Sequence, residues 1–398
     1  MKDLRILHIP NECTGCGACA SICPKQCIDI QPDKDGFYFP VVNFDNCIEC
    51  HSCEKACHVV TSGNTTPISR SDFFVYRTKD VGLRQASTSG GAFSLFANYV
   101  LSQGGVVFGS RYNGDKERLE VCNSDICGLE PLRKSKYIES FVGNAFADIR
   151  KYLKEDRWVL YCGSPCQAAG LRQFVKQTNT SDEKLIIIDF ACHGVPSNKF
   201  FTDFKRKFES RDKRVIDAEF RVKDPEDPLT GWHIQTLRLS FSDGSRRVFR
   251  RNSYYYYYYY YPFDVSCSLR RSCYDCHQVD CSEADITIGD FWDIKDYPSV
   301  KDDNKGYSFI KIHNKKLIPL FRLISSEEFI EKLPDDLVRD PYNKASKMRL
   351  LDNRDRFLSL TRRYPYFKAV TKYFGFKHLF NELVIENIKS KIKRVIGR

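Results

Sequence analysis

The sequence predicts an α/β fold (α+β overall), in which a small cysteine-rich domain precedes a larger mixed α/β domain. Two observations predict this arrangement. Nine of the 18 cysteines lie before residue 58, and most of them form two copies of one spacing pattern. Further along the chain, short strand-like runs alternate with helical patterns, which is typical of an α/β core.

The composition indicates a globular chain of two or three folding units. Of its 398 residues, 42% are hydrophobic, which is too many for a disordered chain. No run reaches the ~18 apolar residues of a membrane span, and residues 1–10 lack the apolar stretch of a secretory signal. We therefore expect a cytoplasmic protein, in which so many cysteines indicate metal or redox sites rather than disulfides.

The first domain, residues 1–60, carries a pattern of iron–sulfur ligands twice. Three thiols at x2 spacing hold one corner of a four-iron cluster, and the fourth cysteine of each copy ligates the other cluster. The spacing thus assigns one [4Fe-4S] cluster to Cys13, Cys16, Cys19 and Cys57. It assigns a second to Cys47, Cys50, Cys53 and Cys23. The stretch resembles a bacterial two-cluster ferredoxin, and a zinc ribbon does not need this register twice.

One further cysteine of this domain, Cys27, lies one turn past Cys23 and is interpreted as a buried core residue rather than a ligand. Residues 61–72, rich in Ser, Thr and Asn, are predicted to be a linker.

The α/β domain is expected to begin with a strand at 73–76. A Ser- and Gly-rich turn at 87–91 follows, and then apolar residues at helical spacing from Phe93 to Leu101. Gly104-Gly105 ends this helix, and the next strand begins at Val106.

A second unit repeats the order of strand, turn and helix. A strand at 158–161 precedes Ser164, an N-cap, and Pro165, which suits the first helical position. The next strand, 185–189, leads to Cys192, and Ser197 is expected to cap the helix that follows. Because ligands gather at the carboxyl ends of such strands, Cys166 and Cys192 are expected to meet there.

Residues 220–250 are predicted to form a β-hairpin around Ser242-Asp243-Gly244. Eight consecutive tyrosines, 254–261, follow. They suit an aromatic platform for a flavin or for bases, but a strand or loop packed half into the core is the favoured interpretation. Nucleic-acid binding is not expected, because the body of the chain has no net charge.

The remaining metal chemistry allows two constructions. Cys273-x2-Cys276 is a metal-ligand spacing, flanked by Cys267 and Cys281. Either these four local cysteines hold zinc or a cluster, or the Cys273/Cys276 pair joins Cys166 and Cys192 to hold a third [4Fe-4S] cluster. Spacing alone does not decide between them.

A series of motifs, in order along the chain, resembles a known family. The series is Arg84–Gly91, Ser135-Lys136-Tyr137, Gly163–Gln167, Cys192–Ser197, Ser272–Cys276 and Ala284–Trp292. Over roughly residues 5–295 the chain is similar to the beta subunit of coenzyme F420-dependent hydrogenase and formate dehydrogenase. We expect residues 73–155 and 156–335 to be the N- and C-terminal parts of the beta-subunit-like domain, and residues 336–398 to be a basic helical tail.

The resemblance implies FAD and a third cluster held by Cys166, Cys192, Cys273 and Cys276. It also favours a binding role for the turn at 87–91. This turn lies at a helix N-terminus, whose unpaired N–H groups suit a pyrophosphate. The flavin ligands are expected among Ser87, Thr88, Ser89, Gly90, Gly91 and Lys136. An ordinary capped turn and a solvated lysine are the alternative interpretations.

We expect an iron–sulfur flavoprotein oxidoreductase, in which His193 either relays a proton or plays a structural role beside a cluster ligand. Its partner would be a redox protein or a small hydride carrier such as coenzyme F420. The resemblance also allows an intermediate of polysaccharide synthesis as substrate. A non-catalytic electron-transfer adaptor is the alternative from a different class.

The tail holds the whole positive excess of the chain. After position 342 there are 15 basic and four acidic residues, which equals the net charge of +11. Ile385, Ile388 and Ile392 repeat at helical spacing among lysines. This pattern predicts a helix that docks on the body, with peripheral contact to the inner membrane face as the alternative. The oligomeric state is not predicted.

Overall fold

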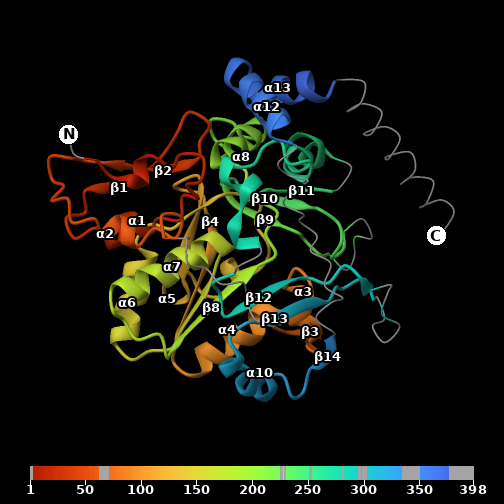
Figure 1. Ribbon diagram of the computed structural model, residues 1–398. Helices are drawn as coiled ribbons and strands as arrows, with labels where there is room; N and C mark the ends of the chain where they lie inside the picture. Colours follow the sequence, from red (N-terminus) through yellow and green to blue (C-terminus); the bar gives the residue numbers. More distant parts are fainter. Residues whose placement is uncertain are drawn as a thin grey trace.

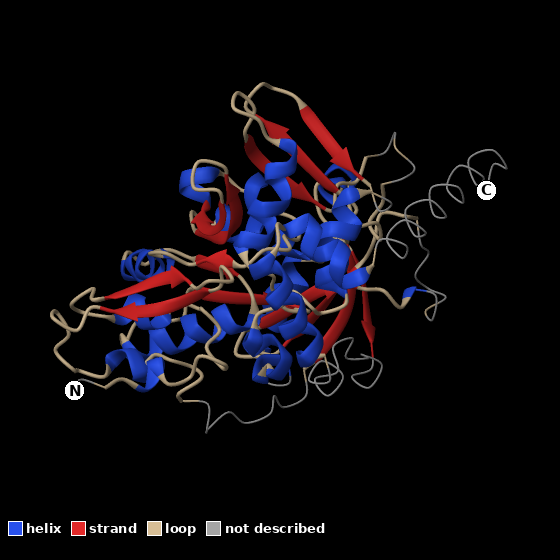
Figure 2. Ribbon diagram, turned by 90° about the horizontal axis from the view of Figure 1, so that it is seen from above, coloured by secondary structure: helices blue, strands red, loops and turns tan. Residues whose placement is uncertain are grey.

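The computed structural model describes residues 3–61, 71–224, 227, 230–250, 253–279, 282–294, 297, 303–333 and 350–375. A small N-terminal lobe projects from the side of a larger α/β body in both ribbon views (Figures 1 and 2). Within the described residues, no helix combines the length and the apolar character that crossing a bilayer requires.

The N-terminal lobe is one antiparallel hairpin with two short helices. Strands β1 (Ile28–Pro32) and β2 (Tyr38–Val42) pair, and α1 (Ala18–Ile22) and α2 (Ser52–Lys55) lie next to each other. A small apolar core that includes Leu4, Ile6 and Ile28 also buries Cys27. Cysteine side chains therefore make up much of the packing in this lobe.

A nine-stranded mixed sheet forms the centre of the body, in the order β14-β3-β13-β12-β8-β7-β4-β5-β6. Its strands are β3 (Asp72–Arg77), β4 (Val106–Asn113), β5 (Arg118–Asn123), β6 (Ser140–Phe141), β7 (Val159–Cys162), β8 (Leu185–Phe190), β12 (Ile286–Asp290), β13 (Ser308–Ile312) and β14 (Phe329–Leu333). The four central strands, β12, β8, β7 and β4, are parallel. The strands predicted at 73–76, 106–108, 158–161 and 185–189 are all present.

Helices cover both faces of this sheet. Alternate side chains of a strand point to opposite faces, so Tyr161 and Ile187 pack with α6 (Ala145–Lys154) and α7 (Pro165–Gln177). Leu160 and Ile186 pack on the other face with α4 (Ala92–Ser102) and α10 (Ile318–Ile324). The fold class expected from the sequence is therefore confirmed.

The N-terminal lobe docks on α7. Ala18 and Ala56 of the lobe share a core with the buried face of this helix. A Cβ on Gly170 would lie 2.9 Å from Cys16 Sγ, so only glycine allows so close an approach. Ser197 lies at the N-cap of α8 (Asn198–Lys205) as expected, but its hydroxyl donates to the Asp35 carbonyl (2.6 Å) instead of capping the helix. This bond ties the lobe to the body a second time.

A three-stranded antiparallel sheet stands beside the main one. It consists of β9 (Val215–Phe220), β10 (Leu237–Phe241) and β11 (Arg246–Phe249), and the β10–β11 hairpin is the predicted one, with Gly244 at a φ of 80°. This sheet packs on an aromatic core that includes Phe220 and Phe249. Helices α12 (Leu351–Arg363) and α13 (Tyr366–Phe374) of the tail pack against the same core. The remaining short helices are α3 (Val81–Gln85), α5 (Ser124–Cys127) and α9 (Tyr261–Asp264).

The tyrosine run forms a helix, so the interpretation as a strand or loop was wrong. Residues 256–260 are a π-helical turn, continued by α9. Rings four residues apart stack on one another, as Tyr255 does on Tyr259 (5.9 Å between centroids). Most of these rings are buried, so tertiary packing overrides the strand preference of tyrosine. The prediction that the run packs into the core was correct. Residues 385–398, the amphipathic part of the predicted tail, lie outside the described residues.

Candidate functional site: three thiol groups and a cavity at the sheet edge

The first three cysteines of the first copy and the last cysteine of the second copy form one group. Burial raises the pKa of Cys19, and the thiols of Cys16, Cys13 and Cys57 raise it further. We call Cys13, Cys16, Cys19 and Cys57 the first thiol group. Cys57, the fourth cysteine of the second copy, thus lies with the first three cysteines of the first copy. The spacing predicts this arrangement, in which the fourth cysteine of each copy ligates the other cluster. Four converging thiols in a buried site, whose thiolate forms would repel one another, suit a cluster that binds all of them as thiolates.

The second thiol group comprises Cys23, Cys47, Cys50 and Cys53, which all line one small cavity. Burial raises the pKa of Cys53 to about 11, with Cys23 contributing. Cys27 is buried as expected, but its Sγ also lies 3.4 Å from Cys23 Sγ. Cys27 is thus both a residue of the apolar core and a neighbour of the second thiol group. Cys53 also raises the pKa of Cys19, which belongs to the first group, so the first two groups are neighbours.

The two copies use the same left-handed backbone at matching positions. Gly15 and Gly17 have φ values of 68° and 76° in the first copy. The equivalent residues of the second copy, 34 positions later, are Glu49 (55°) and His51 (57°). The repeated cysteine spacing is thus accompanied by a repeated backbone conformation.

A third group assembles from three distant segments. Cys166 is the second residue of α7, Cys192 follows β8, and Cys273 and Cys276 lie in and after the 3₁₀ turn Arg271–Asp275. Burial raises the pKa of Cys192, and Cys273, Cys166 and Cys276 all raise it further. We call these four residues the third thiol group. The Ser164 amide donates to Gln167 Oε1, which fixes the first turn of α7 as the expected cap.

The structure places the described cysteines of the two constructions that spacing left open. Cys267 is buried in the aromatic core and donates to the Pro262 carbonyl, and none of the described cysteines is among the groups that shift the pKa of its thiol. Cys281 lies outside the described residues. Among the described residues, no three His, Cys, Asp or Glu side chains converge closely enough for a single metal ion. A four-iron cluster spaces its thiolates more widely. The arrangement favours the ligand set that includes Cys166 and Cys192.

The first and third thiol groups face each other. Among the effects on Cys16 is a charge interaction with Cys166, and Gly170, one turn further along α7, lets the two segments approach. The three groups therefore form a series from the N-terminal lobe into the body.

A cavity of about 320 Å³ opens where parallel strands end. Residues at or after the carboxyl ends of β7, β8 and β12 line it, among them Cys162, Cys192 and Trp292. This is the edge at which ligands of α/β sheets bind. Since Cys192 lines the cavity, the third thiol group is in contact with it.

The glycine-rich turn forms one wall. Ser87, Thr88, Ser89 and Gly91 line the cavity, and Gly91 caps α4 with a φ of 94°. Gly90 does not line it. A Cβ there would lie 2.2 Å from the Tyr76 carbonyl oxygen, so this glycine serves packing. The Ser135 amide donates to Thr88 Oγ1 (2.8 Å), which joins the turn to the Ser135–Tyr137 motif.

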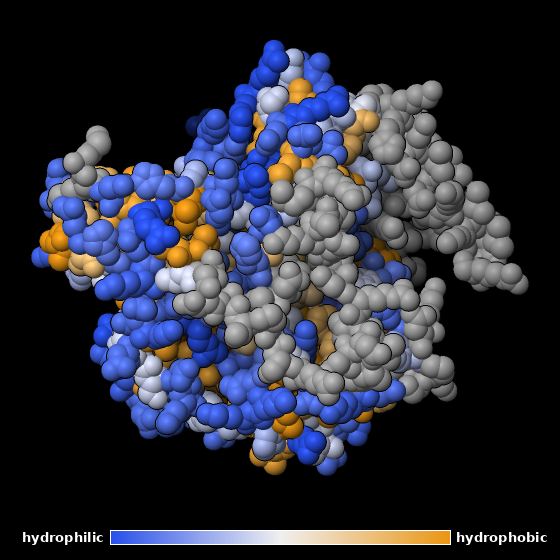
Figure 3. Space-filling model, viewed as in Figure 1, coloured by the Kyte–Doolittle hydropathy of each residue, from blue (hydrophilic) through white to orange (hydrophobic). Residues whose placement is uncertain are grey.

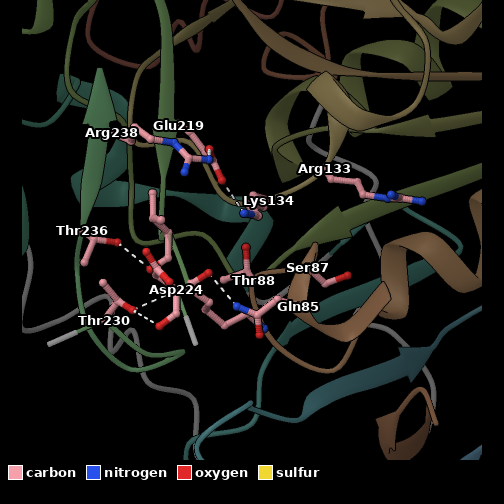
Figure 4. Close-up of polar contacts among 12 residues, drawn as sticks. Gln85, Ser87, Thr88, Arg133, Lys134, Glu219, Asp224, Thr230, Thr236 and Arg238 are labelled. Carbon is pink, nitrogen blue, oxygen red and sulfur yellow. Dashed lines mark hydrogen bonds and ion pairs between the residues drawn. The ribbon is translucent and has the colours of Figure 1, made fainter. Parts of the chain in front are cut away.

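Cationic side chains lie beside this turn. Arg133, Lys134, Lys136 and Arg221 all line the cavity. Figure 4 shows Thr88 near Lys134, whose ammonium group pairs with Glu219. Burial lowers the pKa of Lys136 to about 8, and Lys136 donates to the backbone carbonyls of Arg133 and Lys134. The wall thus combines a helix N-terminus with several positive charges, which suits a pyrophosphate.

Aromatic rings form the remaining wall. Trp292 is 46% exposed and stacks on the buried Trp232 with 4.7 Å between ring centroids. The Arg221 guanidinium lies over Trp292 and donates to the Tyr137 hydroxyl (2.9 Å). Tyr260, from the tyrosine run, also lines the cavity. A flat ring system fits such a surface.

His193 lines the cavity next to Cys192. Its Nε2 lies 2.9 Å from Ser266 Oγ and 3.2 Å from the Phe263 carbonyl, so the ring orientation is fixed. The sequence therefore placed His193, Lys136 and four residues of the turn in one site. It missed Arg221, although Trp292 was part of a recognised motif. No pattern around Arg221 distinguishes it from a surface arginine.

Comparison with known proteins identifies two domains. Residues 156–336 match the family model for the C terminus of the beta subunit of coenzyme F420 hydrogenase/dehydrogenase. Residues 12–60 match the 4Fe-4S dicluster domain. The recognition made from the motifs is thus confirmed for both domains.

Two individual proteins are similar to parts of the chain. An iron-sulfur subunit of the CoB–CoM heterodisulfide reductase of Methanocaldococcus jannaschii is 38% identical over 63 residues, which is 12% of this chain and 9% of that protein. The chain thus spans under a tenth of the length of this relative. The F420-reducing [NiFe] hydrogenase complex from Methanosarcina barkeri aligns with 75% of this chain and 93% of the matched chain, at 14% identity and a TM-score of 0.43.

Proposed function

We propose that the chain is an iron–sulfur oxidoreductase subunit of the F420 hydrogenase beta type, which passes electrons between its clusters and a flavin in the cavity. The family match over residues 156–336 and the dicluster match over residues 12–60 support this proposal. The dicluster domain implies two [4Fe-4S] clusters. The third cluster, the flavin and the substrate are the content of the proposal.

One observation carries the proposal, namely the position of Cys192. This thiol lines the cavity and also belongs to the third group, whose Cys166 faces Cys16 of the first group. A cluster on the third group would therefore connect the ferredoxin-like lobe with the cavity. Without it, the dicluster domain and the cavity would have no redox centre between them.

The residues of the cavity fit a flavin dinucleotide. The turn at the N-terminus of α4, together with Arg133 and Lys136, would bind its pyrophosphate, and the Trp292 wall would hold a ring. A flavin supplies the exchange between a hydride and single electrons when it is bound. The chain's own residues orient the ligand and exclude water, and we assign to His193 a proton held at Nε2 beside the cavity.

Two kinds of partner follow. In the cavity, a small hydride carrier of the deazaflavin kind, which the family name implies, or a sugar- or nucleotide-linked intermediate would meet the flavin. At the other end of the series, a redox protein would dock. Cys50 of the second group is exposed, as is Ile48 (57%), and Figure 3 shows apolar surface on this lobe.

Iron and flavin content test the proposal. Anaerobically reconstituted protein should hold about 12 iron atoms per chain and an extractable flavin. Cys273→Ser should lower the iron to about eight. Cys127→Ser is the control, because the Cys127 thiol donates to nearby carbonyls and lies outside the three thiol groups. Wild-type iron near eight, unchanged by Cys273→Ser, would refute the third cluster.

The non-catalytic alternative separates from the enzyme in one assay. An enzyme bleaches its own flavin when mixed anaerobically with a reduced small carrier. An electron-transfer adaptor exchanges electrons only after a partner protein is added.

A further inference from the structure

The side chain of Arg270 is buried between the first and third thiol groups. Arg270 is 2% exposed and lies three residues before Cys273. Its Nε donates to the Cys13 carbonyl (2.8 Å), and its Nη2 donates to the Tyr38 carbonyl (2.6 Å). Both acceptors belong to the N-terminal lobe, so a side chain of the body reaches into the lobe at the first thiol group.

Arg270 lies beside both thiol groups. Its Nη2 lies 4.0 Å from Cys13 Sγ, which belongs to the first group. Next to the third group, the Cys273 amide donates to the Arg270 carbonyl (3.1 Å), and the Arg270 amide donates to the carbonyl of Val195 (2.9 Å), three residues after Cys192. One buried cation thus lies within the electrostatic reach of both proposed clusters.

Glu139 supplies the counter-charge. It is 4% exposed, pairs with Arg270 Nη1 and accepts from the Tyr38 amide (3.3 Å). A Cβ on Gly15 would lie 3.0 Å from Arg270 Nη1 and 3.1 Å from Glu139 Oε1. The first thiol group's own loop therefore packs directly against this ion pair.

We propose that Arg270 is a positioning residue that sets the reduction potentials of the first and third clusters, with Glu139 as its opposing charge. This inference rests on the proposed function, because it needs a cluster on the third thiol group. Reduction adds an electron to a centre that is already anionic, and a fixed cation in a site of low dielectric stabilises that added charge. With both clusters bound, exchange of one electron between them would oxidise one as it reduces the other, and no proton would be transferred.

A role in docking alone makes a different prediction. Arg362 also joins the body to the lobe, through Nε and Nη2 bonds to Asp35 (2.7 and 2.5 Å), but no cysteine is among the groups that act on it. Arg362→Gln therefore removes an arginine–carboxylate pair between the same two domains away from the thiols. It is the matched control.

The test is an anaerobic redox titration followed by electron paramagnetic resonance, with iron counted in every sample. Arg270→Gln should lower the potentials of the first and third clusters, so that at the wild-type midpoint the reduced-to-oxidised ratio falls at least tenfold, which is 59 mV for one electron. Glu139→Gln should shift them in the opposite direction. Arg270→Lys should stay closer to wild type than Arg270→Gln, and Arg362→Gln should change neither potential.

The signs of these shifts decide. Intact clusters with unchanged potentials in both Arg270→Gln and Glu139→Gln, or shifts of equal sign in the two, would overturn the inference. If Arg270→Gln does not fold, Glu139→Gln decides alone, because an upward shift supports the inference and any other result refutes it. Wild-type protein with about eight irons would refute the proposed function itself, and the inference with it.

Discussion

The two regions that hold thiols are built on different principles. In the N-terminal lobe, eight thiols come from residues 13–57 and are placed by short turns that the cysteine spacing encodes. In the body, four thiols come from segments between residues 166 and 276, and a helix, a strand end and a 3₁₀ turn bring them together. The first two groups therefore depend on local backbone, whereas the third depends on the whole sheet being formed.

The largest expected effect tests whether these groups are independent. Cys192→Ser should remove the third cluster, about a third of the iron, and leave both ferredoxin-type signals intact. Cys19→Ser should remove a cluster of the lobe and leave the third. Iron analysis and electron paramagnetic resonance of both variants measure this. Loss of all iron in either variant would show that the groups form only together.

The sequence predicted the locally determined thiol groups of the lobe more fully than the contacts that depend on the whole fold. Spacing was enough for the lobe, and strand ends were enough to bring Cys166 and Cys192 into one neighbourhood. The role of Arg270 was not visible, because its partners Cys13 and Glu139 are separated from it by more than 100 residues. The helix of the tyrosine run was missed for a related reason. Its conformation is set by rings such as Phe201 and Phe367, which only the fold brings near.

The next effect concerns the sheet on which the third group depends. Gly90→Ala places a Cβ 2.2 Å from the Tyr76 carbonyl and 2.5 Å from the Ser308 amide, and these backbone atoms cannot turn away. We expect a loss of about 3 kcal/mol in the free energy of unfolding. Gly82→Ala, in α3, meets only the Asp80 carboxylate at 3.3 Å and should change stability by less than about 1 kcal/mol.

Urea unfolding followed by far-UV circular dichroism measures both glycine variants. If the lobe is locally determined, Gly90→Ala should also release the third cluster at lower urea than the other two. Release of all three clusters at one urea concentration would contradict the division drawn above.

A smaller effect tests the cavity itself. Burial lowers the pKa of Lys136 to about 8, so its charge is present below that pH and lost as the pH rises through it. If Lys136 binds a pyrophosphate, the affinity for FAD should fall up to about tenfold between pH 7 and pH 9. Lys136→Arg should remove this pH dependence, because arginine stays protonated. Calorimetric titration with FAD at both pH values measures it, and an equal slope in the two proteins would argue against a contact.

The smallest effect separates the two copies of the cysteine pattern. Glu49 and His51 hold left-handed φ values on an exposed surface, so Glu49→Gly and His51→Gly should each stabilise the protein by about 0.5–1 kcal/mol. The reverse change in the first copy, from glycine to alanine, should have a larger effect on stability. Gly15→Ala adds the same strain and also brings a Cβ to 2.8 Å from the Tyr38 carbonyl, so it should cost more than that amount.

The reason lies in what each copy faces. The first copy packs against the body, where Gly15 adjoins the Arg270–Glu139 pair and a Cβ on Gly17 would lie 3.3 Å from Val142 Cβ. At the matching positions of the second copy, Glu49 and His51 are exposed to solvent, where side chains fit. Thermal unfolding of the three single variants, all holding the same iron content, measures the difference. Gain of stability in Gly15→Ala would show that the body does not constrain the first copy. This result would contradict the docking contact on which the series of clusters depends.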